Sequence, residues 1–517
     1  MNVNSVPLFV AIPLLAAFLI PLLARWWKTS GEVLATACTG ILAAMSLASI
    51  GSTAVVHHMG GWAPPVGIAL VSDGLSVLLL IAINVVGFLS LLFSLKYMKE
   101  YTGLSKYYAL FCLMVAGMNG VVVSGDLFNL FVFLEIASVA SYALVAFGVG
   151  ADELEAGFKY LILGSVASVM ILFGVGVIYA VTGSLNMADV AREIATRFGG
   201  GGEMNPAIAL AAALFLMGFG LKAALVPFHA WLPDAHPSAP APISAMLSGV
   251  VIKSLGVYAL CRIFFNVFNV AGGGSTSVII ANSMIAFSVL SIVIGGLLAI
   301  GQWDFKRLLA YSSIGQVGYV MLGIGVGARV LATGGTRSLA ALAILGGLFH
   351  LLNHSAFKSL LFLSSGAIQH ATGTRDMKQL GGLRQKMPVT AMTTNLAALS
   401  ISGVPPFSGF WSKLIIIVAT VKAGHPVVAG VAIAMAFVTL AYYVKVQREI
   451  LFGEIRGAVE RAREVPAAMY VPLIILAIVC VGFGLLYPVF GQQILEPAKD
   501  ALMNASEYID LVKPVLG

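Results

Sequence analysis

Charged side chains inside long apolar runs are the first feature of this sequence that could do chemistry. Lys222, Lys253, Lys358 and Lys413 lie in such runs, and Glu135 is the one acid well inside a run. A charge in hydrocarbon costs several kcal/mol unless it faces water or a partner. Burial favours the neutral amine of a lysine, whereas a nearby carboxylate favours its protonated form. A glutamate that moves toward or away from a lysine could therefore load or release a proton.

A static ion pair between two helices is the alternative use of such charges. Nothing near Glu135 in the sequence compensates its charge, so its partner must come from another helix, and the four lysines are the basic candidates. One static pair would leave the other lysines without a counterion. The excess of cations favours proton transfer over a purely structural use.

Two histidines precede one of these lysines at helical spacing. His350, His354 and Lys358 are four residues apart, so they lie on one face of a helix and cover about 12 Å of its axis. Because histidine titrates near neutral pH, this row suits a proton relay. Two histidines at this spacing can also bind zinc, but no glutamate of the metalloprotease type lies between them and no third ligand is evident. We therefore expect no metal site.

Proline motifs interrupt two of the apolar runs. Pro227 lies near Lys222, and Pro405 and Pro406 lie near Lys413. Proline removes a helical hydrogen bond, and broken helices in corresponding positions of two halves are typical of transport sites. A single kink without function is common in membrane helices. Two breaks, each beside a buried lysine, favour a functional origin.

A polar cluster follows the first proline motif. His229, Asp234 and His236 lie between Pro227 and the next apolar run. They could take in protons from the cytoplasmic side, or they could cap and orient the next helix. The sequence supports both interpretations equally.

Membrane-spanning helices must position all of these residues. Hydrophobic residues make up 59% of the 517 residues and charged residues 10%, against about 25% charged residues in soluble domains. Apolar runs of about 20 residues, each able to cross about 30 Å of hydrocarbon as a helix, repeat along the chain. They do not alternate with period two, which argues against a β-barrel. The sequence predicts an all-α polytopic membrane protein with about fourteen spans: 5–25, 33–55, 69–95, 107–125, 127–149, 158–182, 206–231, 239–265, 278–300, 306–328, 339–367, 390–420, 427–447 and 467–490.

Cofactor motifs are missing from the sequence. The four cysteines are scattered, without a CxxC pair or a metal-binding spacing, and no glycine-rich phosphate loop follows a strand pattern. We therefore expect no cofactor and no redox centre in this chain. The net charge of +7 comes from basic residues in short loops, so it indicates topology rather than a nucleic-acid partner. Because the odd-numbered loops are the more basic, we expect them in the cytoplasm and both termini outside.

The motifs around the lysines resemble those of one family over most of the chain. It comprises the antiporter-like subunits shared by respiratory complex I, Mrp-type cation/proton antiporters and membrane-bound hydrogenases. The resemblance rests on Gly220-Leu221-Lys222, Pro227–His236, Ala239-Pro240-Ala241-Pro242 with Lys253, the row of His350, His354 and Lys358, and Gly403–Phe410 before Lys413. Within the family, Gly60–Ile68 and Phe131-Val132-Phe133-Leu134-Glu135 look most like the D-type subunit of Mrp antiporters.

The resemblance implies a fold of fourteen helices with two inverted five-helix repeats. Helices 4–8 (106–265) would form the first repeat and helices 9–13 (278–450) the second, with helices 7 and 12 broken. Residues 1–105 would hold helices 1–3, and residues 451–517 would hold helix 14 and the tail. The expected location is a prokaryotic cytoplasmic membrane.

The resemblance also implies what the buried residues do. Glu135 and Lys222 would form a switching pair, Lys253 and Lys358 would be intermediate carriers, and Lys413 would be the gate at the far end. The chain would then translocate protons within a larger assembly of membrane subunits, with Na⁺ as the second ion in an antiporter. The alternative is a quinone-associated or NADH-quinone oxidoreductase membrane subunit, whose redox chemistry would lie in other chains.

Overall fold

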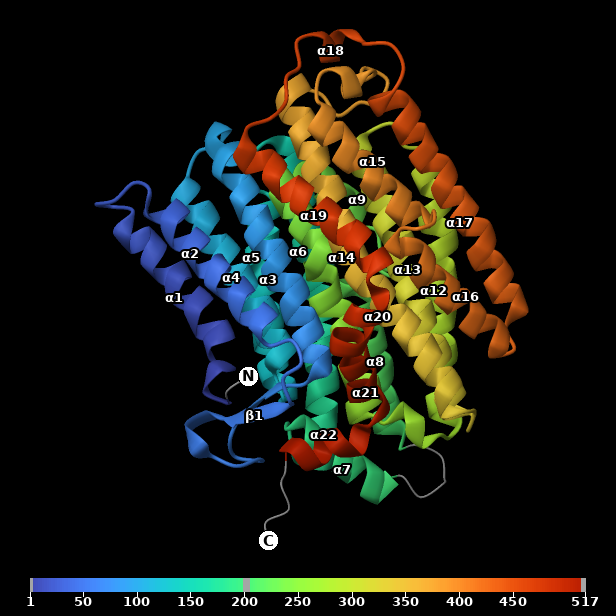
Figure 1. Cartoon of the computed structure of the whole chain (residues 1–517). Coiled ribbons are helices and arrows are strands. Elements are labelled where there is room, and N and C mark those ends of the chain that lie inside the picture. The colour runs from blue at the N-terminus through green and yellow to red at the C-terminus, as the bar shows by residue number, and fades with distance from the viewer. Residues whose placement is uncertain (1–2, 199–204, 513–517) are drawn as a thin grey trace.

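The computed structural model describes residues 3–198 and 205–512, which form a bundle of helices (Figure 1). Within these ranges, twelve helices are long and apolar enough to cross a membrane. They are α1 (Leu8–Leu23), α2 (Ser30–Ala48), α3 (Gly74–Tyr97), α4 (Leu104–Val123), α5 (Leu127–Val145), α6 (Ala151–Thr182), the helix Ala241–Val267, α12 (Ser275–Ile300), α13 (Phe305–Ala332), α14 (Arg337–Thr372), α17 (Pro426–Val446) and α19 (Ala467–Leu485). The prediction of a polytopic membrane protein built mainly of helices is confirmed.

Two further apolar runs are each divided into two shorter helices. The pieces are α8 (Pro206–Lys222), α9 (Leu232–Ser238), α15 (Pro388–Ser402) and α16 (Ser408–Lys422). Pro227 lies in the first gap, and Pro405 and Pro406 lie in the second. The chain therefore leaves helical geometry at both proline motifs, within the span of the bundle.

Side chains and glycine stabilise the ends that these breaks create. A broken helix leaves carbonyl groups without intrahelical donors. Trp231 Nε1 donates to the Leu221 carbonyl at 3.1 Å, and Lys413 Nζ donates to the Ile401 carbonyl at 2.7 Å. Gly403 ends α15 with a φ of 79°, a conformation that glycine adopts without strain. Lys413 thus stabilises the break between α15 and α16.

Several continuous helices begin at an aspartate. The side chains of Asp73, Asp126 and Asp304 accept the backbone N–H of the residue three positions later, at 2.9, 2.8 and 2.9 Å. They are the N-caps of α3, α5 and α13. Each of these aspartates therefore satisfies a backbone donor at the start of its helix.

Two elements at the lower end of the bundle in Figure 1, a β-hairpin and α7, were not predicted from the sequence. Strands β1 (Val55–His58) and β2 (Ala69–Ser72) pair antiparallel, where helical spans were expected to end and begin. The amphipathic α7 (Met187–Phe198) and the tail helices α21 (Glu496–Met503) and α22 (Ala505–Val512) lie on the same side. The short α18 (Gly457–Glu460) marks the opposite end, and α20 (Tyr487–Phe490) leads from α19 into the tail.

The charged helices are the most buried ones. The helix Ala241–Val267, α13, α14 and α3 are largely covered by other helices, whereas α1, α2, α6, α17 and α19 are mainly exposed at the periphery. Lys253, His350, His354 and Lys358 belong to the buried group. The fold therefore surrounds these side chains with protein rather than with lipid.

Candidate functional site

The structure brings the predicted acid and one lysine together. Glu135 Oε1 on α5 lies 3.7 Å from Lys222 Nζ at the end of α8. Lys222 donates to Ser138 Oγ at 2.9 Å and to Tyr142 OH at 3.1 Å, and Ser168 of α6 donates to Glu135. The side chain of Lys222 is 2% exposed and that of Glu135 is 32% exposed. The two charges attract each other across this distance without a direct hydrogen bond, so the strength of the interaction depends on their separation.

Two hydroxyl groups bridge the surroundings of Lys253 and Lys358. Lys253 opens a π-helical turn and donates to the Ser248 carbonyl at 2.5 Å. Ser248 Oγ lies 2.8 Å from Ser313 Oγ, and Ser313 donates to the Leu309 carbonyl at 2.8 Å. Lys358 donates to the same carbonyl at 2.8 Å. The two carbonyls accept hydrogen bonds but carry no proton, so a relay between these lysines would need water to connect the amines to the two hydroxyls.

A second polar path begins on the other side of Lys358. Lys358 Nζ lies 3.5 Å from Tyr443 OH, which lies 3.2 Å from Ser312 Oγ. Tyr442 OH donates to the same serine at 3.0 Å. These hydroxyls come from α13 and α17, so they connect the lysine of α14 to two neighbouring helices.

His350 extends the polar groups toward the second helix break. Its Nε2 lies 3.1 Å from Gln316 Oε1 and its Nδ1 lies 2.9 Å from Ser412 Oγ. Ser412 directly precedes Lys413 on α16. The His354 ring is parallel to the His350 ring at a centroid distance of 6.5 Å, and its nitrogens have no hydrogen-bond partner among the described residues. The histidines thus occupy the space between Lys358 and Lys413.

Three of the lysines have no acidic neighbour. Among residues 3–198 and 205–512, no carboxylate lies within 4 Å of the amines of Lys253, Lys358 or Lys413. All three are buried, and backbone carbonyls accept their hydrogen bonds. An amine without a fixed counterion can lose a proton without leaving an unpaired carboxylate behind. This environment suits proton exchange better than a static pair.

The structure separates the three residues of the predicted cytoplasmic intake. Asp234 lies at the surface and pairs with Lys159 at 3.1 Å and Arg307 at 3.7 Å. His236 is fully buried and stacks on Phe362 with ring centroids 4.5 Å apart. His229 is half-buried in the gap after α8. Asp234 therefore faces the surface, whereas His236 faces the interior of the bundle.

Sequence analysis missed two buried cations. Lys306, 2% exposed, donates to the Ala239 carbonyl at 2.8 Å. It begins the predicted span 306–328, so it was treated as a loop residue. Arg262 lies inside the predicted span 239–265 and should have been noticed there. It binds Asp73 in a bidentate pair at 2.7 and 2.8 Å.

The pair of Arg262 and Asp73 is structural and lies apart from the lysines. Burial alone would raise the pKa of Asp73, but the guanidinium of Arg262 outweighs burial, so the pKa is lowered from 3.8. Arg262 also contacts the Tyr508 ring of α22 at 4.9 Å. The pair therefore joins the start of α3 to the C-terminal tail.

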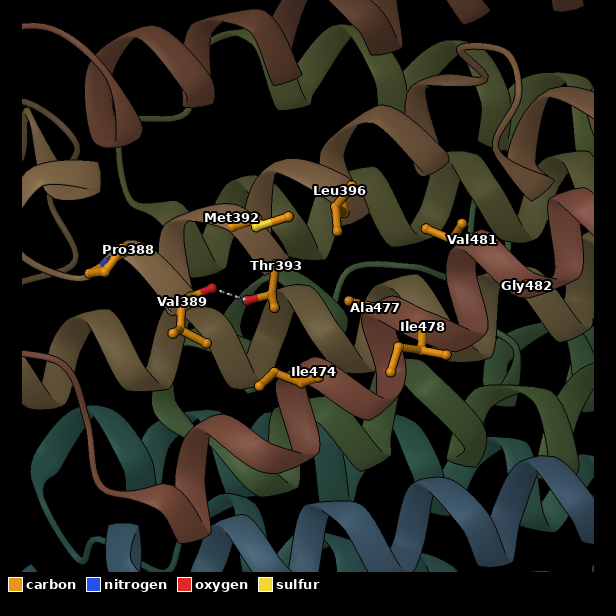
Figure 2. A pocket seen from close by; sticks show the side chains of 10 residues that line it. All are labelled: Pro388, Val389, Met392, Thr393, Leu396, Ile474, Ala477, Ile478, Val481 and Gly482. Atoms are coloured by element: carbon orange, nitrogen blue, oxygen red, sulfur yellow. Dashed lines mark hydrogen bonds between the residues drawn. The ribbon is translucent and has the colours of Figure 1, made fainter.

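An apolar groove of about 620 Å³ lies between α15 and α19 (Figure 2). Its lining includes Met392, Leu396, Ile474 and Ile478, and Thr393 is its only side chain with a hydroxyl. Thr393 donates to the Val389 carbonyl of its own helix at 3.0 Å. The groove lacks ionisable side chains, so it does not belong to the polar path.

Comparison with known proteins gives matches along nearly the whole chain. Residues 124–439 match the family described as NADH:quinone oxidoreductase/Mrp antiporter, TM, and residues 62–108 match NADH-ubiquinone oxidoreductase (complex I), chain 5 N-terminus. NADH-quinone oxidoreductase subunit N of Desulforudis audaxviator is 37% identical over 510 residues, which cover 95% of this chain and 96% of that protein.

One antiporter protein and one solved antiporter complex are similar over the same length. The D-type Na(+)/H(+) antiporter subunit of Alkalihalophilus pseudofirmus is 32% identical over 514 residues, covering 98% of this chain and 99% of that protein. A chain of the Mrp complex from Dietzia sp. DQ12-45-1b superimposes with a TM-score of 0.87 at 29% identity, covering 98% of this chain and 99% of that chain.

Proposed function

The chain belongs to the NADH:quinone oxidoreductase/Mrp antiporter transmembrane family, and we propose that it translocates protons as one membrane subunit of a larger complex. Its similar proteins are named as subunits, and one solved relative is a chain of the Mrp complex. The expected partners are therefore other membrane subunits. Protons would be the transported ion, with Na⁺ as the counter-ion if the parent complex is an antiporter.

The observation that carries this proposal is the row of buried lysines without acidic neighbours. Lys253, Lys358 and Lys413 are each held by backbone carbonyls, and hydroxyls and imidazoles lie between them. A charged lysine raises the cost of protonating the next one, so protons advance one at a time. Glu135 and Lys222 would start or stop this series of proton transfers, because the electrostatic attraction between them, now 3.7 Å apart, changes with their separation.

The arrangement of helices supports the finer topology of the family. Counting α8 with α9 as one crossing, and α15 with α16 as another, adds two to the twelve long helices and gives fourteen. An even number returns the chain to its starting side. The basic segments 375–386 and 448–463 lie toward the end marked by α18 in Figure 1, opposite the hairpin and the tail. We therefore propose inverted repeats at 106–265 and 278–450, and both termini outside.

The test is proton transport by the complex that co-purifies with the tagged chain. Lys222→Ala and Glu135→Ala should each abolish proton translocation in reconstituted vesicles, while the same partner subunits co-purify in unchanged amounts. The transport would be followed with a pH-sensitive dye. Full translocation by both variants, with assembly intact, would refute the proposed switch.

The parent complex decides what drives the transport. The relative from Desulforudis favours a redox-driven assembly, and the relative from Alkalihalophilus favours an antiporter. Addition of Na⁺ to energised vesicles should collapse the pH gradient only if the chain serves an antiporter. Proton uptake on addition of an electron donor would instead assign it to an oxidoreductase.

A further inference from the structure

We infer that Lys306 is the first protein group to accept protons from the cytoplasmic face and that it passes them through His236 to Lys358. This inference rests on the proposed function, because it adds an intake branch to the same row of lysines. Lys306 is the second residue of α13, yet its side chain turns inward and is buried. Its amine donates to the Ala239 carbonyl, between α9 and the helix Ala241–Val267.

A charged surface cleft of about 290 Å³ lies at the start of α13, where Asp304 and Arg307 line it on either side of Lys306 in the sequence. Asp234, Asp304, Arg307 and Arg375 contribute to its lining. Arg375 Nε lies 2.5 Å from Asp304 Oδ2, and its Nη1 donates to the Pro237 carbonyl at 2.5 Å. Arg375 binds Asp304, and Lys159 and Arg307 bind Asp234, so the two carboxylates are paired with cations. Water that fills the cleft would reach the start of α13, where Lys306 lies.

His236 occupies the space on the inner side of Lys306. It is fully buried, and neither ring nitrogen has a hydrogen-bond partner among the described residues. Buried polar atoms are almost always satisfied, so an unpartnered imidazole indicates a transient partner. His236 precedes Ala239, whose carbonyl accepts the hydrogen bond from Lys306, by three residues. Phe362, on which the ring stacks, lies one helical turn from Lys358 on α14.

The helix that carries Lys306, α13, also contacts Lys358. Leu309, whose carbonyl accepts from Lys358 at 2.8 Å, follows Lys306 by three residues on α13. Residues three apart lie on neighbouring positions of one helix face. Lys306, His236 and Lys358 therefore line one short interior path beneath the cleft.

The alternative is that Lys306 has only a structural role, in which its hydrogen bond to the Ala239 carbonyl connects α13 to the end of α9. Lys306→Arg separates the two, because arginine keeps the charge and the donor but does not release a proton. Lys306→Gln keeps a donor and loses the charge. A relay predicts that both variants lose about tenfold or more of the translocation rate. A structural role alone predicts a normal rate for Lys306→Arg.

The experiment uses the complete complex in vesicles and a matched control, Lys358→Gln. Both Lys306 variants should co-purify with their partners and show a larger solvent hydrogen isotope effect than the wild type, because proton intake becomes rate-limiting. If Lys306→Gln does not assemble, Lys306→Arg alone decides the question. A normal rate in Lys306→Arg together with an inactive Lys358→Gln overturns the intake branch and leaves the proposed function standing. A normal rate in Lys358→Gln overturns the proposed function itself.

Discussion

Shortening the acid of the switching pair tests whether its distance to the lysine sets the transport rate. In Glu135→Asp, the carboxylate retreats by one methylene, about 1.5 Å. At an effective dielectric constant of about 20, the attraction between the charges is about 4.5 kcal/mol at 3.7 Å. It falls to about 3.2 kcal/mol at about 5.2 Å. The difference of about 1.3 kcal/mol corresponds to about a tenfold slower rate, as an upper limit because Glu135 is partly exposed.

The assay compares initial proton uptake rates of vesicles that carry equal amounts of assembled complex. Glu135→Asp should retain a measurable rate, and Glu135→Gln should have none. Ser168→Ala removes the hydroxyl that binds the carboxylate without moving the charge, so it controls for loss of that hydrogen bond alone. A wild-type rate in Glu135→Asp, or a loss as complete as in Glu135→Gln, would refute the distance argument.

Three further substitutions test the surroundings of the path. Asp73→Asn leaves the buried Arg262 unpaired and should cost about 3–5 kcal/mol of stability, seen as a lower Tm in detergent. Because folding lowers the pKa of Asp73 from 3.8, the wild-type pair stabilises fully above that pH and loses its contribution as the pH falls through the lowered pKa, a step that the variant should lack. Gly256→Ala places a Cβ 2.4 Å from a backbone nitrogen just after α8, so we expect about 1–3 kcal/mol of destabilisation and less assembled protein. Tyr443→Phe removes the hydroxyl 3.5 Å from an amine of the path and should slow translocation about tenfold without lowering the Tm.

Each of these has a matched control. Gly482→Ala meets no atom within 4 Å and should leave assembly unchanged. Equal yields of the two glycine variants would contradict the close packing at Gly256. An Asp73→Asn protein as stable as the wild type, or a Tyr443→Phe protein that translocates at the normal rate, would show that the corresponding contact is dispensable.

Hydrophobic periodicity predicted the helices because a membrane forces every backbone group to bond within its own segment. Each predicted run contains a helix or a divided helix, and the proline motifs mark where α8 and α15 end. The hairpin of β1 and β2 was missed because each strand has only four residues and overlaps one end of a predicted span. Its pairing depends on long-range contacts that no local pattern reveals.

The charged residues could be predicted, but their neutral partners could not. A lysine in an apolar run is conspicuous, whereas Ser248, Ser313 and Tyr443 are ordinary residues for a membrane helix. They became part of the path only because the helices pack so that their hydroxyls meet. Lys306 was missed for a related reason, because its position at a span end says nothing about which way its side chain turns.

The contact between Arg262 and Tyr508 has a consequence for how the protein is made. Tyr508 belongs to the last described helix, whereas Asp73 and Arg262 are synthesised much earlier. The ribosome therefore completes the aromatic cover of this charge pair only after it has made Tyr508. A product truncated before α22 would carry an incompletely enclosed guanidinium, a defect that membrane proteases can recognise.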